Sequence, residues 1–188
     1  MDLRAAILGF LSWKPLSGYD LKKMLSQSEI FYWSGNNNQV YKSLLELQQD
    51  GLVDYLVQQQ ESLPAKKIYS ITEQGLAELQ NSLQTAPELP ELRKNFLIQL
   101  AWCELLSDRQ IIRLLEEYTN ELESRLQLFL GQAQITAHHP QRSDRESYLW
   151  RRIHYNLVEA YQTELNWTRQ TLLDFRQKNY EKDQEANS

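Results

Sequence analysis

The sequence predicts a mainly α-helical chain with a small β-wing: an N-terminal winged helix-turn-helix followed by a C-terminal dimerisation domain of long helices. Two observations support this fold class. Apolar residues recur at helical spacing along most of the chain. Only residues 52–59 and 66–71 have the composition of paired strands. The proline-containing stretch 85–90 is the one clear linker, so we expect domains at residues 1–86 and 87–188.

Proline and a capping pattern delimit the first two helices. Helical spacing predicts a helix over residues 2–13, which ends before Pro15 because proline disfavours helix at the preceding residue. Ser17 followed by Asp20 resembles a capping box and predicts the start of a second helix. Amides at such a helix N-terminus bind phosphate readily. The candidate DNA-binding residues in this second helix are Tyr19 and Lys22.

The third predicted helix has two unlike faces. It begins near Asn36 and ends at Gly51, because glycine is the usual left-handed terminator. One face is apolar at core spacing, whereas the other is rich in asparagine, a poor helix former. Asn and Gln side chains can pair with adenine in the major groove, and lysine can reach guanine or a phosphate. The alternative is an ordinary solvated face. The candidate DNA-reading residues are Asn36, Asn37, Asn38, Gln39, Tyr41 and Lys42.

A hairpin and a further helix complete the predicted N-terminal domain. The strands 52–59 and 66–71 flank a turn at residues 62–65, and Thr72 can cap the helix that follows. Lys66 and Lys67 lie at the base of this wing, where a paired cation can contact the DNA backbone beside the recognition helix. A solvated hairpin is the alternative.

Beyond the linker the chain is predicted to be helical. One helix ends near Leu106, a long one runs from residue 107 to the His138–His139–Pro140 segment, and a last long one follows the polar residues 141–147. Steps of three and four between apolar positions form a seam that needs a partner. The candidate dimer-interface residues are Ile111, Leu115, Tyr118, Leu122, Ile153, Leu157, Tyr161 and Leu165.

The tryptophans of the second half allow two interpretations. Packing in the core and in the subunit seam is the simpler one. Alternatively, aromatic side chains around a dimer cavity can hold a flat apolar effector. The candidate effector-pocket residues are Trp102, Trp150 and Trp167.

Bulk properties exclude several other classes of function. The formal net charge of −5 argues against nonspecific nucleic-acid binding but not against sequence-specific binding. Cys103 is the sole cysteine, and neither a membrane span nor a signal peptide is recognisable. The histidines lack the spacing of a metal site, and no glycine-rich phosphate loop or serine elbow occurs. We expect no catalytic residue, no metal ion, no cofactor and no membrane partner, and a cytoplasmic location.

Several short motifs carry a family resemblance over nearly the whole chain. In the first half they are residues 7–9, 17–21, 31–33, 40–44, 51–53 and 67–75, the last reading Lys-Ile-Tyr-Ser-Ile-Thr-Glu-Gln-Gly. In the second half they are residues 92–97 and 164–167. With these motifs the chain resembles the PadR family of bacterial transcriptional regulators, in the subgroup with the C-terminal helical domain of the AphA-type virulence activators.

The resemblance implies a function and an assembly. It implies a homodimer that binds double-stranded DNA at a palindromic operator and acts as a repressor rather than an activator. It places Tyr19, Asn38, Tyr41 and Lys42 at or near DNA, with the two wing lysines beside them. A different class of function remains open, namely a winged-helix module for protein interaction with no direct DNA readout.

Overall fold

In the computed structural model of the 188-residue chain, the structure describes residues 2–27, 38–59, 65–87, 89, 94–132, 140 and 142–178. The chain divides into two compact units, Met1–Leu89 and Pro90–Ser188. This division follows shortly after the expected boundary between residues 86 and 87. Each unit is described by itself below.

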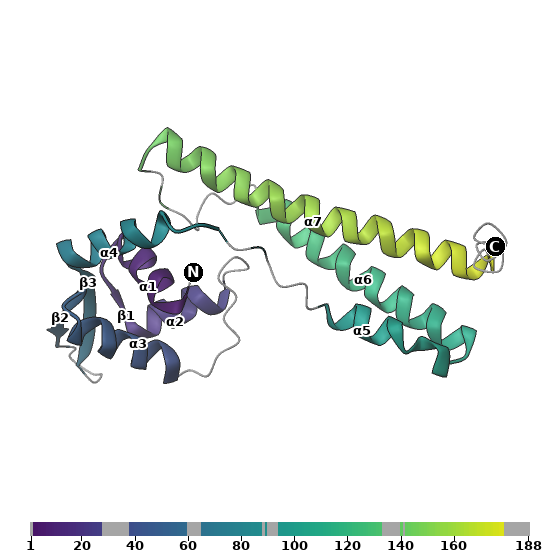
Figure 1. The fold of residues 1–188 in the computed structure, drawn as a ribbon, viewed down its shortest axis with the longest axis horizontal. Helices are drawn as coiled ribbons and strands as arrows, with labels where there is room; N and C mark the ends of the chain where they lie inside the picture. Colours follow the sequence, from purple (N-terminus) through teal and green to yellow (C-terminus); the bar gives the residue numbers. More distant parts are fainter. Residues whose placement is uncertain are drawn as a thin grey trace. The chain divides into compact units, whose positions relative to one another are not determined.

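The N-terminal unit combines helices with a small sheet (Figure 1). The predicted fold class, mainly α with a β-wing in a winged helix-turn-helix, is confirmed, together with the long helices that follow it. The helices of this unit are α1 (Leu3–Leu11), α2 (Gly18–Gln27), α3 (Asn38–Gln49) and α4 (Glu73–Leu83), and its strands are β1 (Leu16–Ser17), β2 (Val53–Gln58) and β3 (Lys66–Ile71).

The sheet has one strand more than the sequence indicated. Its order is β1-β3-β2, and both pairs are antiparallel. In β1, Leu16 lies opposite Tyr69 and Ser17 lies opposite Ile68. The prediction of a two-stranded wing was therefore incomplete, because two residues are too few to show a strand periodicity. The consequence is that the start of α2 is joined directly to the wing.

Short polar contacts fix where the helices begin. The side chain of Asp2 accepts a hydrogen bond from the Ala5 amide at 3.0 Å, and Thr72 accepts one from the Gly75 amide at 3.0 Å. The backbone of α4 also lies close to the end of α3. A Cβ atom added to Gly75 would lie 2.0 Å from the carbonyl oxygen of Leu52, so only glycine fits at this position.

The core of the N-terminal unit fixes α3 against α1 and α2. Ile7 of α1, Leu21 of α2, and Leu44 and Leu47 of α3 are completely buried in one apolar cluster. Burying one such side chain contributes about 1.5–3 kcal/mol. The opposite side of α3 is consequently left facing outward.

The C-terminal unit contains α5 (Asn95–Ala101), the short 3-10 helix η1 (Cys103–Leu105), α6 (Asp108–Gln132) and α7 (Asp144–Arg176). Helices α6 and α7 run side by side in opposite directions (Figure 1). The helix expected to reach Leu106 instead ends at Ala101 and continues as η1. Residues 133–139, which include His138 and His139, lie outside the described residues.

Burial within one chain corrects part of the expected dimer seam. Ile111, Leu115 and Leu122 of α6 and Leu165 of α7 are buried in clusters that the chain forms by itself. For these side chains, the apolar seam packs against the neighbouring helix of the same chain, and an interface with a second subunit stays a prediction. Sequence periodicity alone does not tell the two cases apart. Of the other expected interface residues, Tyr118, Leu157 and Tyr161 are half-buried and Ile153 is exposed.

Candidate nucleic-acid interface

The start of α2 lies directly against the first turns of α3. Gly18 is buried, and a Cβ atom at this position would lie 2.6 Å from Cε1 of Tyr41 and 3.4 Å from Cδ1 of Leu44. Any other residue would have to push the Tyr41 ring aside. This close approach brings Tyr19 and the outer face of α3 to one side of the unit.

The outer face of α3 is polar and exposed. Val40, Leu44 and Leu47 are buried against the core. On the other side, Tyr41 is 49% exposed and the Lys42 side chain is 77% exposed, with its ammonium 3.8 Å from Glu46. Asn36 and Asn37 lie outside the described residues. The α3 face, as we use the term, consists of the exposed residues Asn38, Gln39, Tyr41 and Lys42.

The remaining candidates of α2 differ in accessibility. Tyr19 is 64% exposed, whereas Lys22 is half-buried. Tyr19 follows the residue that begins α2, at the helix end where backbone amides and the helix dipole attract anions. The geometry therefore suits Tyr19 for a contact with a phosphate better than Lys22.

The two wing lysines have different partners. Lys66 Nζ donates to Oδ2 of Asp20 at 3.1 Å. The same oxygen accepts a hydrogen bond from the Ser17 hydroxyl at 2.6 Å. That hydrogen bond, and then the Lys66 ammonium, lower the pKa of the Asp20 carboxyl below its ordinary value. Lys67 is exposed, and its ammonium lies 4.0 Å from the centre of the Tyr55 ring.

Two contacts in this unit were not found by sequence reasoning. One is the Asp20–Lys66 pair, and the other joins Arg4 of α1 to Asp50 beyond the end of α3. In both cases the partners are 46 positions apart in the chain. No periodic pattern links residues at such a distance, so only the packed structure could reveal these contacts.

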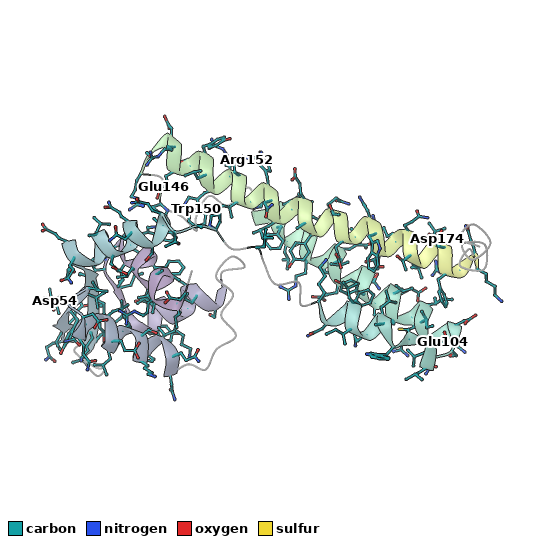
Figure 2. The ribbon with its side chains drawn as sticks, in the orientation of Figure 1. Asp54, Glu104, Glu146, Trp150, Arg152 and Asp174 are labelled. Carbon is teal, nitrogen blue, oxygen red and sulfur yellow. The ribbon has the colours of Figure 1, made fainter. Side chains whose placement is uncertain are left out.

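The three tryptophans do not form a pocket in a single chain. Trp102 is 70% exposed at the end of α5, and Trp167 packs edge-on against Phe96 with ring centres 6.4 Å apart. Trp150 lies in the first half of α7 (Figure 2), and the spacing from position 150 to 167 corresponds to about 25 Å of helix. The three tryptophans therefore do not share a pocket within one chain, and the effector pocket expected at a dimer cavity stays a prediction.

A polar cluster lies inside the C-terminal unit instead. The Phe96 and Tyr118 rings stack with centres 3.6 Å apart, and the Tyr118 hydroxyl donates to Oε1 of Glu164 at 3.1 Å. Lys94 pairs with the other oxygen of Glu164. Burial, and then the Glu164 carboxylate, raise the pKa of Tyr118 from 10.0 to about 12. This cluster fastens the start of α5 to α6 and α7.

Other kinds of site receive no support from the part of the chain that the structure describes. Within it, no group of three or more His, Cys, Asp or Glu side chains is placed to hold a metal ion. Among the same residues, no helix combines the length and apolar character that a membrane span requires. Cys103 is buried. The outward-facing groups of α2, α3 and the wing are thus the strongest candidate site.

Comparison with known proteins agrees with this geometry. Residues 7–81 match the transcriptional regulator PadR-like family. The negative transcriptional regulator PadR of Bacillus subtilis is 28% identical over 125 residues, which cover 66% of this chain and 69% of that protein. This chain is therefore similar to PadR-like regulators through its N-terminal residues. It is accordingly a transcriptional regulator of the PadR type.

Solved structures extend the likeness of fold to nearly the whole chain. B. subtilis PadR in complex with operator DNA has a TM-score of 0.78 at 23% identity, covering 92% of this chain and 98% of that one. The same protein in complex with p-coumaric acid has a TM-score of 0.72 at 22% identity, with coverages of 93% and 98%. The Vibrio cholerae virulence activator AphA has a TM-score of 0.68 at 23% identity, also with coverages of 93% and 98%. The PadR-like fold therefore includes the C-terminal helices.

Proposed function

We propose that this chain is a repressor that binds a palindromic operator as a homodimer. One observation carries the proposal: α3 buries an apolar side and presents an exposed amide-and-lysine side, the α3 face, next to the start of α2. The similarity to a negative regulator, whose structure is known with operator DNA, supports it. The proposed site of action is the cytoplasm, where bacterial DNA lies.

In this proposal each element has a distinct task on the duplex. The α3 face enters the major groove, where Asn38 and Gln39 offer donors and acceptors to base edges and Lys42 reaches guanine or a phosphate. Tyr19, Lys22 and Tyr41 contact the backbone beside the groove, together with the wing. Phosphate contacts fix the register, whereas base contacts give sequence specificity.

The proposed homodimer uses exposed apolar residues of the C-terminal unit. Side chains buried between α6 and α7 are not accessible to a second subunit, but many large apolar ones on α5, η1 and the first half of α7 are exposed. A second copy that covers them would place two recognition helices about 34 Å apart, as successive major grooves require. The residues proposed to face a second copy are Leu97, Ile98, Trp102, Leu105, Tyr148, Leu149, Ile153 and Tyr155.

We also propose a small aromatic or apolar effector. The support is the structure of a relative in complex with p-coumaric acid and the aromatic composition of this C-terminal unit. Within one chain Trp102, Trp150 and Trp167 do not share a cavity, so an effector that uses them would bind where two subunits meet. An effector with different affinities for two dimer arrangements would change DNA affinity.

The decisive test is DNA binding by full-length protein. We expect fragments from the region upstream of its own gene to be retained in a gel shift, with retention that weakens as salt is added. Asn38→Ala combined with Lys42→Ala should reduce affinity for the retained fragment by at least tenfold. Asn120→Ala combined with Lys178→Ala is the matched control, since both residues are exposed in the C-terminal unit, and it should retain DNA normally.

The alternative function makes the opposite prediction. A winged-helix module for protein interaction would retain no fragment, or would retain it equally well after the double substitution on the α3 face. Either result would refute direct DNA readout by α3.

A further inference from the structure

An ion pair between Lys66 and Asp20 fastens the turn end of the wing to helix α2. Lys66 is the first residue of β3, and Asp20 lies in the first turn of α2. Their charged atoms are 3.1 Å apart, and their side chains are only 35% and 39% exposed. The Asp20 carboxylate also accepts from the hydroxyl of Ser17, which is buried. Ser17 itself lies in β1, opposite Ile68 of β3. Strand pairing thus joins β1 to β3, and the ion pair joins α2, which follows β1 directly, to the same strand.

The neighbouring lysine provides a natural comparison. Side chains alternate between the two faces of a strand, so Lys67 points away from the side on which Lys66 meets Asp20. Lys67 is exposed and lies over the Tyr55 ring, where its ammonium is accessible from solvent. The two adjacent cations therefore differ in whether their charge is already matched by a carboxylate.

We propose that Lys66 is a positioning residue, held by Asp20, and that Lys67 is the wing cation that contacts a phosphate. The inference rests on the proposed DNA-binding function and deepens it. Fastening the turn end of the wing to α2 before binding lowers the ordering cost that a loose hairpin would incur on the duplex. If Lys66 left Asp20 for a phosphate, an unpaired carboxylate would remain beside the DNA backbone.

This assignment predicts that one substitution changes DNA affinity in the direction opposite to that expected from charge alone. Asp20→Asn removes a negative charge near DNA, and long-range electrostatics alone would make binding tighter. The asparagine oxygen can still accept from Ser17, but the charge that holds Lys66 is gone. With the wing released, we expect weaker binding. The sign of the change thus separates positioning from simple charge attraction.

The experiment measures anisotropy of a labelled duplex of about 30 base pairs, enough for two half-sites one helical turn apart, taken from the region upstream of the chain's own gene. Full-length Asp20→Asn, Lys66→Met and the double variant are titrated at several salt concentrations. Lys66→Arg tests rescue by a residue that can keep the ion pair. Lys67→Met is the matched control, because it removes the adjacent cation without touching Asp20.

We expect Asp20→Asn and Lys66→Met each to weaken binding by about two- to fivefold, the strength of a partly exposed ion pair. The double variant should bind no more weakly than either single one, because both remove the same interaction. The salt dependence should stay as in the wild type, whereas Lys67→Met should reduce its slope by about one per subunit. Tighter binding by Asp20→Asn, or a reduced slope for Lys66→Met, would overturn the proposal.

A second measurement keeps this test independent of the proposed function. Urea unfolding of the wild type, Asp20→Asn, Lys66→Met and the double variant forms a double-mutant cycle that needs no DNA. Coupling between Asp20 and Lys66 supports the fastening of the wing even if the wild type retains no duplex. Additive effects in that cycle would overturn the proposed fastening of the wing, even if DNA binding is established.

Discussion

The two units of this chain bury their apolar side chains in different ways. The N-terminal unit closes a core among four helices and a sheet, with residues such as Ile7 and Leu44 completely buried. The C-terminal unit buries Leu115 and Leu165 between two long helices, yet leaves Trp102 at 70% and Leu105 at 86% exposure. This difference supports the proposal that a second copy covers exposed apolar surface of the C-terminal unit.

The largest expected effect comes from deleting a core leucine in each unit. Leu44→Ala and Leu115→Ala both empty fully buried positions, and we expect each to reduce the free energy of unfolding by about 2–5 kcal/mol. The transition affected by Leu44→Ala should not depend on protein concentration. That of Leu115→Ala should, because the proposed dimer would stabilise its unit by mass action. Urea titrations at two protein concentrations measure this.

The control for this pair is Leu45→Ala. Leu45 is 53% exposed on α3, so its loss should change stability by less than about 0.5 kcal/mol. A Leu115→Ala transition that does not move with protein concentration would break the contrast between the units.

A charge placed on the uncovered surface should act next most strongly. Leu105→Asp should weaken self-association at least tenfold, about 1.4 kcal/mol, because an unpaired carboxylate would be buried between subunits. Sedimentation over a range of concentrations measures the shift. Leu56→Asp on the wing, at a position 77% exposed, should leave the oligomeric state unchanged. Wild-type protein that sediments as single subunits at micromolar concentration would refute the proposed dimer.

The smallest expected effect concerns alkaline pH and the C-terminal unit alone. The folded unit holds the pKa of Tyr118 at about 12 instead of 10.0. Between these values the unfolded chain loses a proton that the folded chain keeps, so stability falls as pH rises. The contribution of Tyr118 to stability is fully present below pH 10. The loss should stay below about 1 kcal/mol, because Tyr118 is only partly buried and solvent screens its charge.

Chemical denaturation at several pH values measures this loss, and Tyr118→Phe is the matched control because it lacks the titrating hydroxyl. Its stability should change less between pH 10 and 12 than that of the wild type. Equal losses in both proteins would show that Tyr118 is not the group responsible.

Local chemistry made most of the N-terminal unit predictable. The Ser17–Asp20 and Thr72 caps mark helix starts in the structure, and Gly51 has the left-handed φ of 72° expected of a helix terminator. Strand β3 has the bounds that its sequence predicts, Lys66–Ile71. The two-residue strand β1 was missed because its pairing depends on β3, which lies far along the chain.

The candidate site was predictable only as a set of residues. Periodicity separated the buried side of α3 from the side that carries Asn38 and Lys42, since each helix position has a fixed direction. It did not show that Lys66 and Lys67 have different partners. It also grouped three tryptophans that lie apart in the folded unit.

The sequence by itself determined the order of the elements, their polarity and the resemblance to PadR-like regulators. These features depend on neighbouring residues and on periods of two or three to four positions. Only the tertiary structure decided which surfaces remain available. Burial between α6 and α7 removed Leu115 and Leu165 from the set of interface residues, and an ion pair with Asp20 gave Lys66 a local partner. The physical reason is that burial and charge pairing depend on which distant segments meet, and a one-dimensional pattern contains no distances.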